Sequence, residues 1–156
     1  TLTIGDSDTQ GTIDVGTAGR FRLRGSNSNQ CRVYGGDQLK PAIVTGGDFD
    51  WDASATKVHL KWIDYQQTMT TGGGASTITL DGDCEFDAVT ISQGDTLDIN
   101  GQHAIFGDNL LILGTDGSLG TLDFGDGAIV KCRADFKCDD ADANIYFGTG
   151  SVVWMV

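Results

Sequence analysis

The chain contains a single proline among 156 residues and few of the Leu, Ala, Glu and Lys runs that build helices. It contains 23 glycines instead, and glycine is costly inside a helix. Little in the sequence repeats at the period of 3.6 residues that marks an amphipathic helix. These shortages argue against a helical protein and predict an all-β chain with many turns.

Basic residues are also scarce, at 10 Lys and Arg against 22 Asp and Glu, so that the formal net charge is -12. Binding to nucleic acid depends on clustered basic residues that contact phosphates, so we expect no nucleic acid partner. No apolar run approaches the roughly 20 residues of a membrane-spanning helix. No leader with a charged start and an apolar centre is visible either. We therefore expect a soluble protein with no membrane partner.

A short repeat in the second half of the chain sets the predicted architecture. Residues 94–99 return as residues 119–124, where the motif Thr-Leu-Asp is displaced by 25, and residues 103–106 return as 127–130, displaced by 24. From residue 76 onward, apolar clusters recur about every seven residues, with Gly, Asn or Asp at the corners between them. A unit of about 24 residues with three short strands predicts one triangular coil of a parallel β-solenoid, stacked roughly 4.8 Å above the next coil.

An antiparallel β-sandwich or jelly roll is the alternative, because short strands separated by turns would look similar in sequence. The segment 131–139 favours it, since its polar residues alternate with apolar residues 130–138 over a length unusual for one side of a solenoid. We predict one all-β domain over residues 1–156, with an N-terminal region (residues 1–70) and a more regular repeat region (residues 75–156). The poorer repeats of the N-terminal region leave a different β arrangement open there.

The cysteines show no metal-binding pattern, because no two of them are spaced as Cys-x-x-Cys. Two repeat units separate Cys84 from Cys132, and two coils span roughly 10 Å, which is too long for a disulfide. Cys132 and Cys138 alternate in phase with Val130, so both are expected to point inward as reduced thiols. Reduced thiols fit assembly in a reducing cytoplasm.

Three aspartates, Asp48, Asp50 and Asp52, alternate like the opening of a calcium-binding loop. The EF-hand pattern would then require Gly at position 53 and Glu at position 59, where Ala53 and His59 stand. Calcium at these aspartates is a hypothesis, and a solvated acidic loop is the alternative. We expect no other cofactor.

Arginines alternate with apolar residues between Arg20 and Arg24, so that Arg20, Arg22 and Arg24 fall on one face of a half-buried strand. This row is either a solvated face that balances nearby aspartates or a docking stripe for an acidic partner. The chain also ends on five apolar residues, and such a strand is expected to be covered. Val152, Val153, Trp154 and Met155 are therefore candidate partner-binding residues.

The sequence contains no motif for catalysis. His59 and His103 are the two histidines, and neither lies in a nucleophile-base motif, so both are interpreted as ordinary exposed histidines. His59 alternates with Val58, Leu60 and Trp62, which predicts a strand with those three residues facing the core. We also expect Trp154 inside. We expect a protein that is not an enzyme.

The Thr/Gly/Asp-rich style of residues 76–156, with units such as residues 78–82, 96–101 and 120–126, resembles the β-solenoid segments of tailed-bacteriophage virion proteins. That resemblance implies a structural role, often as a trimer, and carries over no catalytic residue. Together with the absent leader, it predicts a capsid-decorating or stabilising protein of a virus particle, assembled in the host cytoplasm and bound to capsid or other virion proteins. The alternatives are a surface adhesin or glycan-binding module and, less favoured, a polysaccharide-degrading solenoid enzyme.

Overall fold

The computed structural model describes residues 1–6, 9–14, 20–23, 30–46, 48–51, 57–71, 75–112, 114–115, 118–138 and 143–156. Within residues 20–23, 48–51 and 114–115, and at Ser118, the description is of the backbone alone. The described residues form strands, turns and bends and contain no helix. Across these residues, therefore, no helix has the length and apolar character that crossing a membrane requires.

Three parallel sheets form the walls of the molecule. The first sheet contains β1 (Leu2–Ile4), β4 (Cys31–Gly35), β7 (Lys57–Lys61), β10 (Thr77–Leu80), β13 (Thr96–Asp98), β18 (Thr121–Asp123) and β21 (Asn144–Tyr146). The second contains β2 (Thr12–Asp14), β5 (Ala42–Thr45), β8 (Ile63–Tyr65), β11 (Cys84–Phe86), β14 (His103–Phe106), β19 (Ile129–Cys132) and β22 (Val152–Met155). The third contains β3 (Arg20–Leu23), β6 (Asp48–Trp51), β9 (Met69–Thr70), β12 (Val89–Ile91), β15 (Leu110–Ile112) and β20 (Phe136–Cys138).

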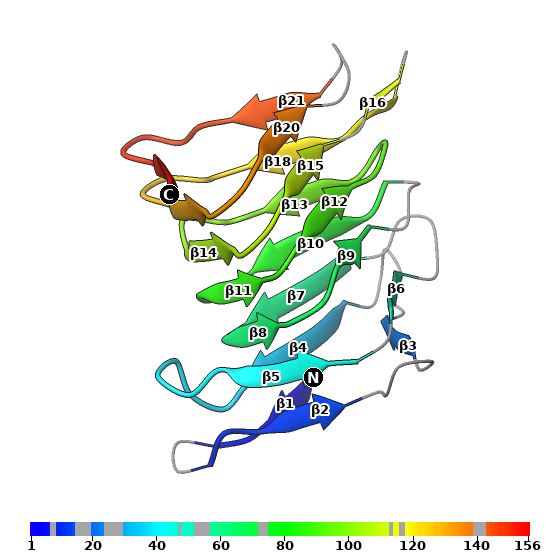
Figure 1. Cartoon of the computed structure of the whole chain (residues 1–156), viewed down its shortest axis with the longest axis vertical. Helices are drawn as coiled ribbons and strands as arrows, with labels where there is room; N and C mark the ends of the chain where they lie inside the picture. Colours follow the sequence, from blue (N-terminus) through cyan, green and yellow to red (C-terminus); the bar gives the residue numbers. More distant parts are fainter. Residues whose placement is uncertain are drawn as a thin grey trace.

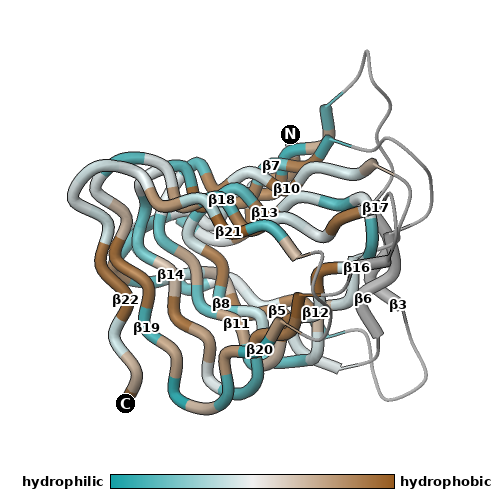
Figure 2. The backbone as a smooth tube through the Cα atoms, turned by 90° about the horizontal axis from the view of Figure 1, so that it is seen from above, coloured by the Kyte–Doolittle hydropathy of each residue, from teal (hydrophilic) through white to brown (hydrophobic). Residues whose placement is uncertain are grey.

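The chain visits the three sheets in turn and then climbs to the next level, so that successive coils stack along one axis (Figure 1). Figure 2 looks along that axis and shows the sheets as walls around a common interior. The fold is therefore the predicted parallel β-solenoid and not the antiparallel sandwich. Between β15 and β18, β16 (Gly114–Thr115) and β17 (Ser118–Leu119) add a small antiparallel hairpin.

The first half of the chain belongs to the same three sheets as the second half. β4 pairs with β7, and β5 pairs with β8, in the same parallel manner as the later strands. Residues 66–71 also take part, because they contain β9, which pairs with β6 and β12. In the described part of the first half, the different arrangement that the sequence left open does not occur.

The predicted period of about 24 residues holds as an average, but individual coils differ in length. Thr79 on β10 is paired with Asp98 on β13, and these two residues are 19 residues apart in the chain. Beside β2 and β5, Gln10 Nε2 donates a hydrogen bond to the Pro41 carbonyl across a coil of 31 residues.

The structure tests both displacements that the repeat predicted. The displacement of 25 is confirmed by the pair Thr96–Thr121. The displacement of 24 is wrong, because the register pairs His103 with Ile129 and not with Gly127. A shift of two residues preserves which side chains face inward, so the predicted inward positions still hold.

Apolar residues at matching positions form columns through the interior. One column contains Val58, Ile78, Leu97 and Leu122, which pair successively across β7, β10, β13 and β18. All four side chains are fully buried. Burial of a side chain of this size contributes roughly 1.5–3 kcal/mol, so each coil is held mainly by the coils above and below it.

Trp62 forms a corner and does not face the core as predicted. Strand β7 ends at Lys61, and Trp62 takes the left-handed conformation with φ of 55°. Its ring is partly exposed, and Lys61 Nζ lies 3.9 Å from the ring centroid. The Trp62 carbonyl accepts a hydrogen bond of 2.9 Å from the amide of Ala42 in the preceding coil. The same carbonyl passes directly over Gly35.

The long alternation of residues 130–138 comes from two strands, β19 and β20, which are separated by a corner at residues 133–135. Phe136 and Cys138 pair with the buried residues Leu110 and Ile112. The prediction that their side chains point toward the interior is therefore correct. Cys138 is nevertheless exposed, because β20 is the edge strand of the third sheet, and no further strand of the described residues pairs with it. Cys132 is buried as expected.

Candidate functional site

The best-connected polar cluster lies on the outer face of the first sheet. Tyr34 on β4 donates its hydroxyl hydrogen bond to Asp81 Oδ2, and His59 Nδ1 on β7 lies 3.0 Å from Asp81 Oδ1. Asp81 directly follows β10, so three consecutive coils each supply one member of this triad. We call Tyr34, His59 and Asp81 the first-sheet triad.

The triad shifts two pKa values. Burial of the Asp81 carboxylate alone would raise its pKa, but hydrogen bonds from Tyr34 and His59 and the positive charges nearby outweigh burial and hold the pKa below its ordinary value. Burial, and then the hydrogen bond to the Asp81 carboxylate, raise the pKa of the Tyr34 hydroxyl. The carboxylate fixes the His59 ring through Nδ1, and the His59 side chain is only 17% exposed. His59 is thus not the ordinary exposed histidine that the sequence predicted.

Replacing Asp81 with asparagine should remove a pH-dependent part of the stability. Because the folded-state pKa of Asp81 is lowered, its carboxylate stabilises the fold above its ordinary pKa of 3.8, and this contribution disappears as the pH falls below that value. At pH 7 we expect Asp81→Asn to lower the free energy of unfolding by about 1 kcal/mol. The measurement is urea denaturation at pH 7 and near pH 3. The exposed Asp108 supplies a control, Asp108→Asn, with the same charge change; an equal effect of both variants would contradict the assignment.

Two recesses lie over the second sheet. One, of about 390 Å³, is lined by Asp64, Gln66, Glu85, Phe86, Asp87, Gly107 and Arg133. Arg133 Nη1 reaches across one coil to Glu85 Oε1 at 2.9 Å. The other recess, of about 220 Å³, includes His103, whose Nδ1 lies 3.6 Å from Asp83 Oδ2. Both are open to solvent, and their charged and amide side chains offer hydrogen-bonding groups to a small polar ligand.

The second sheet also carries an apolar surface at its C-terminal end. Ile129 on β19 is 38% exposed, and its neighbour in register on β22, Val152, is 42% exposed. Trp154, two residues further along β22, is 58% exposed and faces outward, which corrects the prediction that it lies inside. We call Ile129, Val152 and Trp154 the second-sheet patch.

Two other residues of the predicted partner-binding strand face the opposite way. Val153 pairs with Val130 and packs against the core, and Met155 pairs with Cys132 and is 56% exposed at the last coil. The predicted partner-binding segment therefore divides into an outward pair and an inward pair. Alternation along one strand imposes this division.

The predicted arginine row and the predicted calcium site are neighbours in the third sheet. Arg20 pairs with Asp48, and Arg22 pairs with Asp50, between β3 and β6. Paired positions in a sheet lie about 4.8 Å apart, so the backbone register sets the arginine positions next to the aspartate positions. Arg24 and Asp52 lie outside the described residues.

The side chains that the structure describes include no group of three His, Cys, Asp or Glu residues that could hold a metal ion. The side chains of Asp48 and Asp50, and the whole of Asp52, are outside that description, so calcium binding there stays a prediction. Buried Cys84 is a poor ligand, because burial raises the pKa of its thiol to about 12. It does not share a column with Cys132 either: Cys84 pairs with Ala104, whereas Cys132 pairs with Phe106.

The sequence did not reveal the first-sheet triad, because its members are far apart in the chain. Tyr34 and Asp81 are separated by 47 residues, and His59 and Asp81 by 22. The outward phase of His59 and the position of Asp81 at a strand end were visible signals. The pairing of their coils was not. Comparisons with protein-family models, with curated proteins and with solved structures found no match to this chain.

Proposed function

We propose that the chain is a non-enzymatic structural protein that works through protein-protein contacts made by the second-sheet patch. The observation that carries the proposal is the outward exposure of Trp154 beside Val152 and Ile129. Because these residues face sideways from the sheet, a further coil stacked on the end would leave them on the surface. Clustered exposed apolar residues mark contact surfaces, and tryptophan is among the residues that contribute most to binding at them.

The setting that we propose is the surface of a virus particle, where the protein would decorate or stabilise the capsid and contact capsid or other virion proteins. The resemblance of residues 76–156 to phage solenoid segments supports this setting, and the rigid stack of parallel coils suits a structural role. The same resemblance implies a homo-oligomer, with a trimer favoured, and assembly in the host cytoplasm. No catalytic residue is part of the proposal.

Replacing Trp154 with serine should strongly weaken partner binding without unfolding the chain. Loss of an aromatic residue at the centre of a contact costs about 2 kcal/mol or more, which is roughly a thirty-fold loss of affinity. Cosedimentation with purified virus particles measures the effect. Tyr146 is 55% exposed on the first sheet and supplies the control, Tyr146→Ser, which should bind normally. Wild-type protein that never sediments with any assembly would overturn the proposal.

A glycan-binding module is the second candidate, and the 390 Å³ recess is the observation that favours it. Its carboxylate, amide and guanidinium groups match the hydroxyl groups of a sugar. A glycan array separates this candidate from the structural one. Release of reducing sugars would instead indicate the polysaccharide-degrading enzyme, with the paired carboxylates of Asp64 and Glu85 as the first residues to test.

A further inference from the structure

One outward column of the first sheet changes its charge from positive to negative along the solenoid. The register pairs the members successively across five consecutive strands, β4, β7, β10, β13 and β18. In order, the column contains Arg32, His59, Thr79, Asp98 and Asp123. We call it the charge column. Thr79 stands at its middle, with Arg32 and His59 on one side and two aspartates on the other. The Asp81 carboxylate, which contacts His59 Nδ1, lies beside the basic half.

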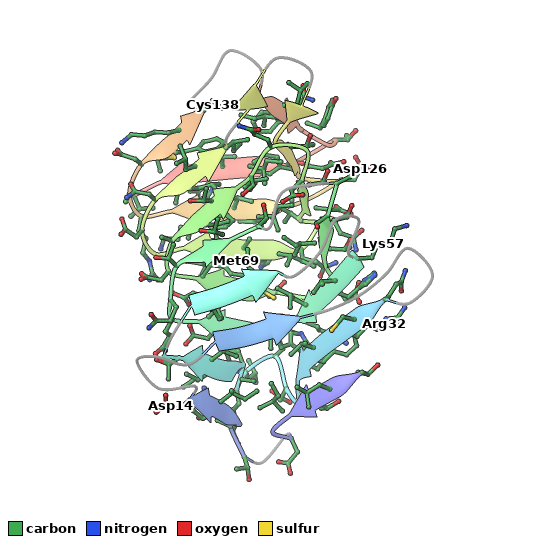
Figure 3. The ribbon with its side chains drawn as sticks, turned by 90° about the vertical axis from the view of Figure 1, so that its right-hand side faces the viewer. Asp14, Arg32, Lys57, Met69, Asp126 and Cys138 are labelled. Carbon is green, nitrogen blue, oxygen red and sulfur yellow. The ribbon has the colours of Figure 1, made fainter. Side chains whose placement is uncertain are left out.

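The charge column is accessible to a partner. Arg32 is exposed, and the other four members are partly exposed. Figure 3 shows Arg32 and the nearby Lys57 projecting from the same side of the molecule. Lys57 is also exposed and lies on β7, so it extends the basic half of this face.

The acidic half of the column has no direct salt-bridge partner among the described residues. Asp98 and Asp123 occupy paired positions in neighbouring coils, and like charges at such positions repel each other. Burial, and then the charge of Asp123, raise the pKa of the Asp98 carboxyl, as expected for two adjacent carboxylates. Across the described residues, no lysine or arginine forms a salt bridge with either aspartate.

We propose that a second copy of this chain docks face to face on the first sheet, with the two charge columns running in opposite directions. The two-fold axis would lie along the strands and pass through Thr79. Arg32 would then face the partner's Asp123, and His59 would face the partner's Asp98. This arrangement is isologous, because the same surface serves both copies.

The symmetry follows from the order of the strands. A half-turn about a line along β10 reverses the solenoid axis and keeps the strand direction. It therefore lays β4 over β18 and β7 over β13 of the other copy, with β10 over β10. Because position along the strand is unchanged, each member of the charge column meets another member of the same column. No other column of the described first sheet contains both an arginine and two aspartates in this order.

The association should be weak. Five strands spaced about 4.8 Å apart, each three to five residues long, cover a few hundred Å² per copy, less than the roughly 800 Å² of a standard interface. The net charge of -12 on each copy also opposes pairing. We therefore expect the dimer to form at protein concentrations of about 100 µM and above. This proposal uses a different sheet from the second-sheet patch, so each can fail without the other.

The main test is sedimentation equilibrium over about 10 µM to about 1 mM protein. We expect wild-type protein to associate in pairs through the first sheet, and Arg32→Asp or Asp123→Arg alone to weaken this association at least about ten-fold through like-charge contacts. The two substitutions in one chain should restore it to within about three-fold, because each contact re-forms with reversed polarity. Lys131 faces outward on the second sheet, so Lys131→Asp, with the same charge change as Arg32→Asp, should leave association unchanged.

A second measurement covers the case in which Asp123→Arg does not fold, since Asp123 Oδ1 accepts a hydrogen bond of 3.0 Å from the Gly125 amide. Thr79→Cys in a Cys138→Ser background places a thiol at the proposed axis, where facing sheets lie roughly 10 Å apart. A bismaleimide of about that length should cross-link two copies there, whereas Thr90→Cys on the third sheet should give no cross-link. Monomers at about 1 mM, association that Arg32→Asp leaves unchanged, or no cross-link at Thr79→Cys would each overturn the proposal.

Discussion

Replacing Gly35 with alanine should destabilise the protein by about 3 kcal/mol or more. A Cβ atom at Gly35 would lie 2.1 Å from the Trp62 carbonyl oxygen and 2.9 Å from the Ala42 amide nitrogen. Both atoms belong to the backbone, so neither can swing aside as a flexible side chain could. The carbonyl and the amide are also partners in a hydrogen bond between coils, which the new methyl group would force apart. Urea denaturation followed by circular dichroism measures the loss.

Gly107 provides the matched control for this prediction. A Cβ atom there would meet its nearest neighbours at 3.5 Å, which is ordinary van der Waals contact. We therefore expect Gly107→Ala to change the free energy of unfolding by less than about 0.5 kcal/mol. Equal losses for the two variants would show that the lost glycine flexibility, and not the close approach of Trp62, decides the effect.

Replacing Phe106 with alanine should destabilise the protein by about 3–5 kcal/mol, because it leaves a cavity that the stacked coils cannot close. Phe106 is fully buried on β14, and its ring stacks on that of Phe86 with 5.7 Å between the centroids. Neighbouring coils above and below fix the spacing in the interior. The surrounding side chains therefore cannot move in to fill the cavity, which in a looser core would reduce the loss of stability.

The control for this substitution is Ile129→Ala. Ile129 is 38% exposed and faces outward on the next strand of the same sheet, so truncation should cost less than about 1 kcal/mol. The midpoint of urea denaturation should fall sharply for Phe106→Ala alone. A loss of under about 1 kcal/mol at Phe106 would mean that its column contributes little to holding the coils together.

The solenoid could be predicted from the sequence because two of its causes are local. Gly, Asn and Asp mark the corners, and alternation within three-residue strands marks the inward residues. The pair Thr96–Thr121 shows that a short motif can even identify the register. The register of His103 escaped prediction because the corner before Ile129 is one residue longer than the corner before His103, and nothing in the motif reports corner length.

The candidate site could not be predicted in the same way. A constant period of 24 would carry Tyr34 to positions 58 and 82, not to the positions of its actual neighbours. Tyr34 meets Asp81 because the intervening coils are unequal, as the pairs Tyr34–Lys61 and Lys57–Thr77 show. The outward position of Trp154 was missed for a different reason. Its apolar neighbours suggested burial, but side chains alternate along a strand, so Trp154 points outward where Val153 points inward.

The unequal coils have a consequence for how the molecule can be altered. The long coil between β1 and β4 and the short coil between β10 and β13 pair equally well in the same sheet. Closing the longer coil costs only about 0.4 kcal/mol more chain entropy than closing the shorter one. The corners are therefore natural insertion sites, where a foreign peptide of ten or so residues could be displayed without disturbing the ladder of strands beneath it.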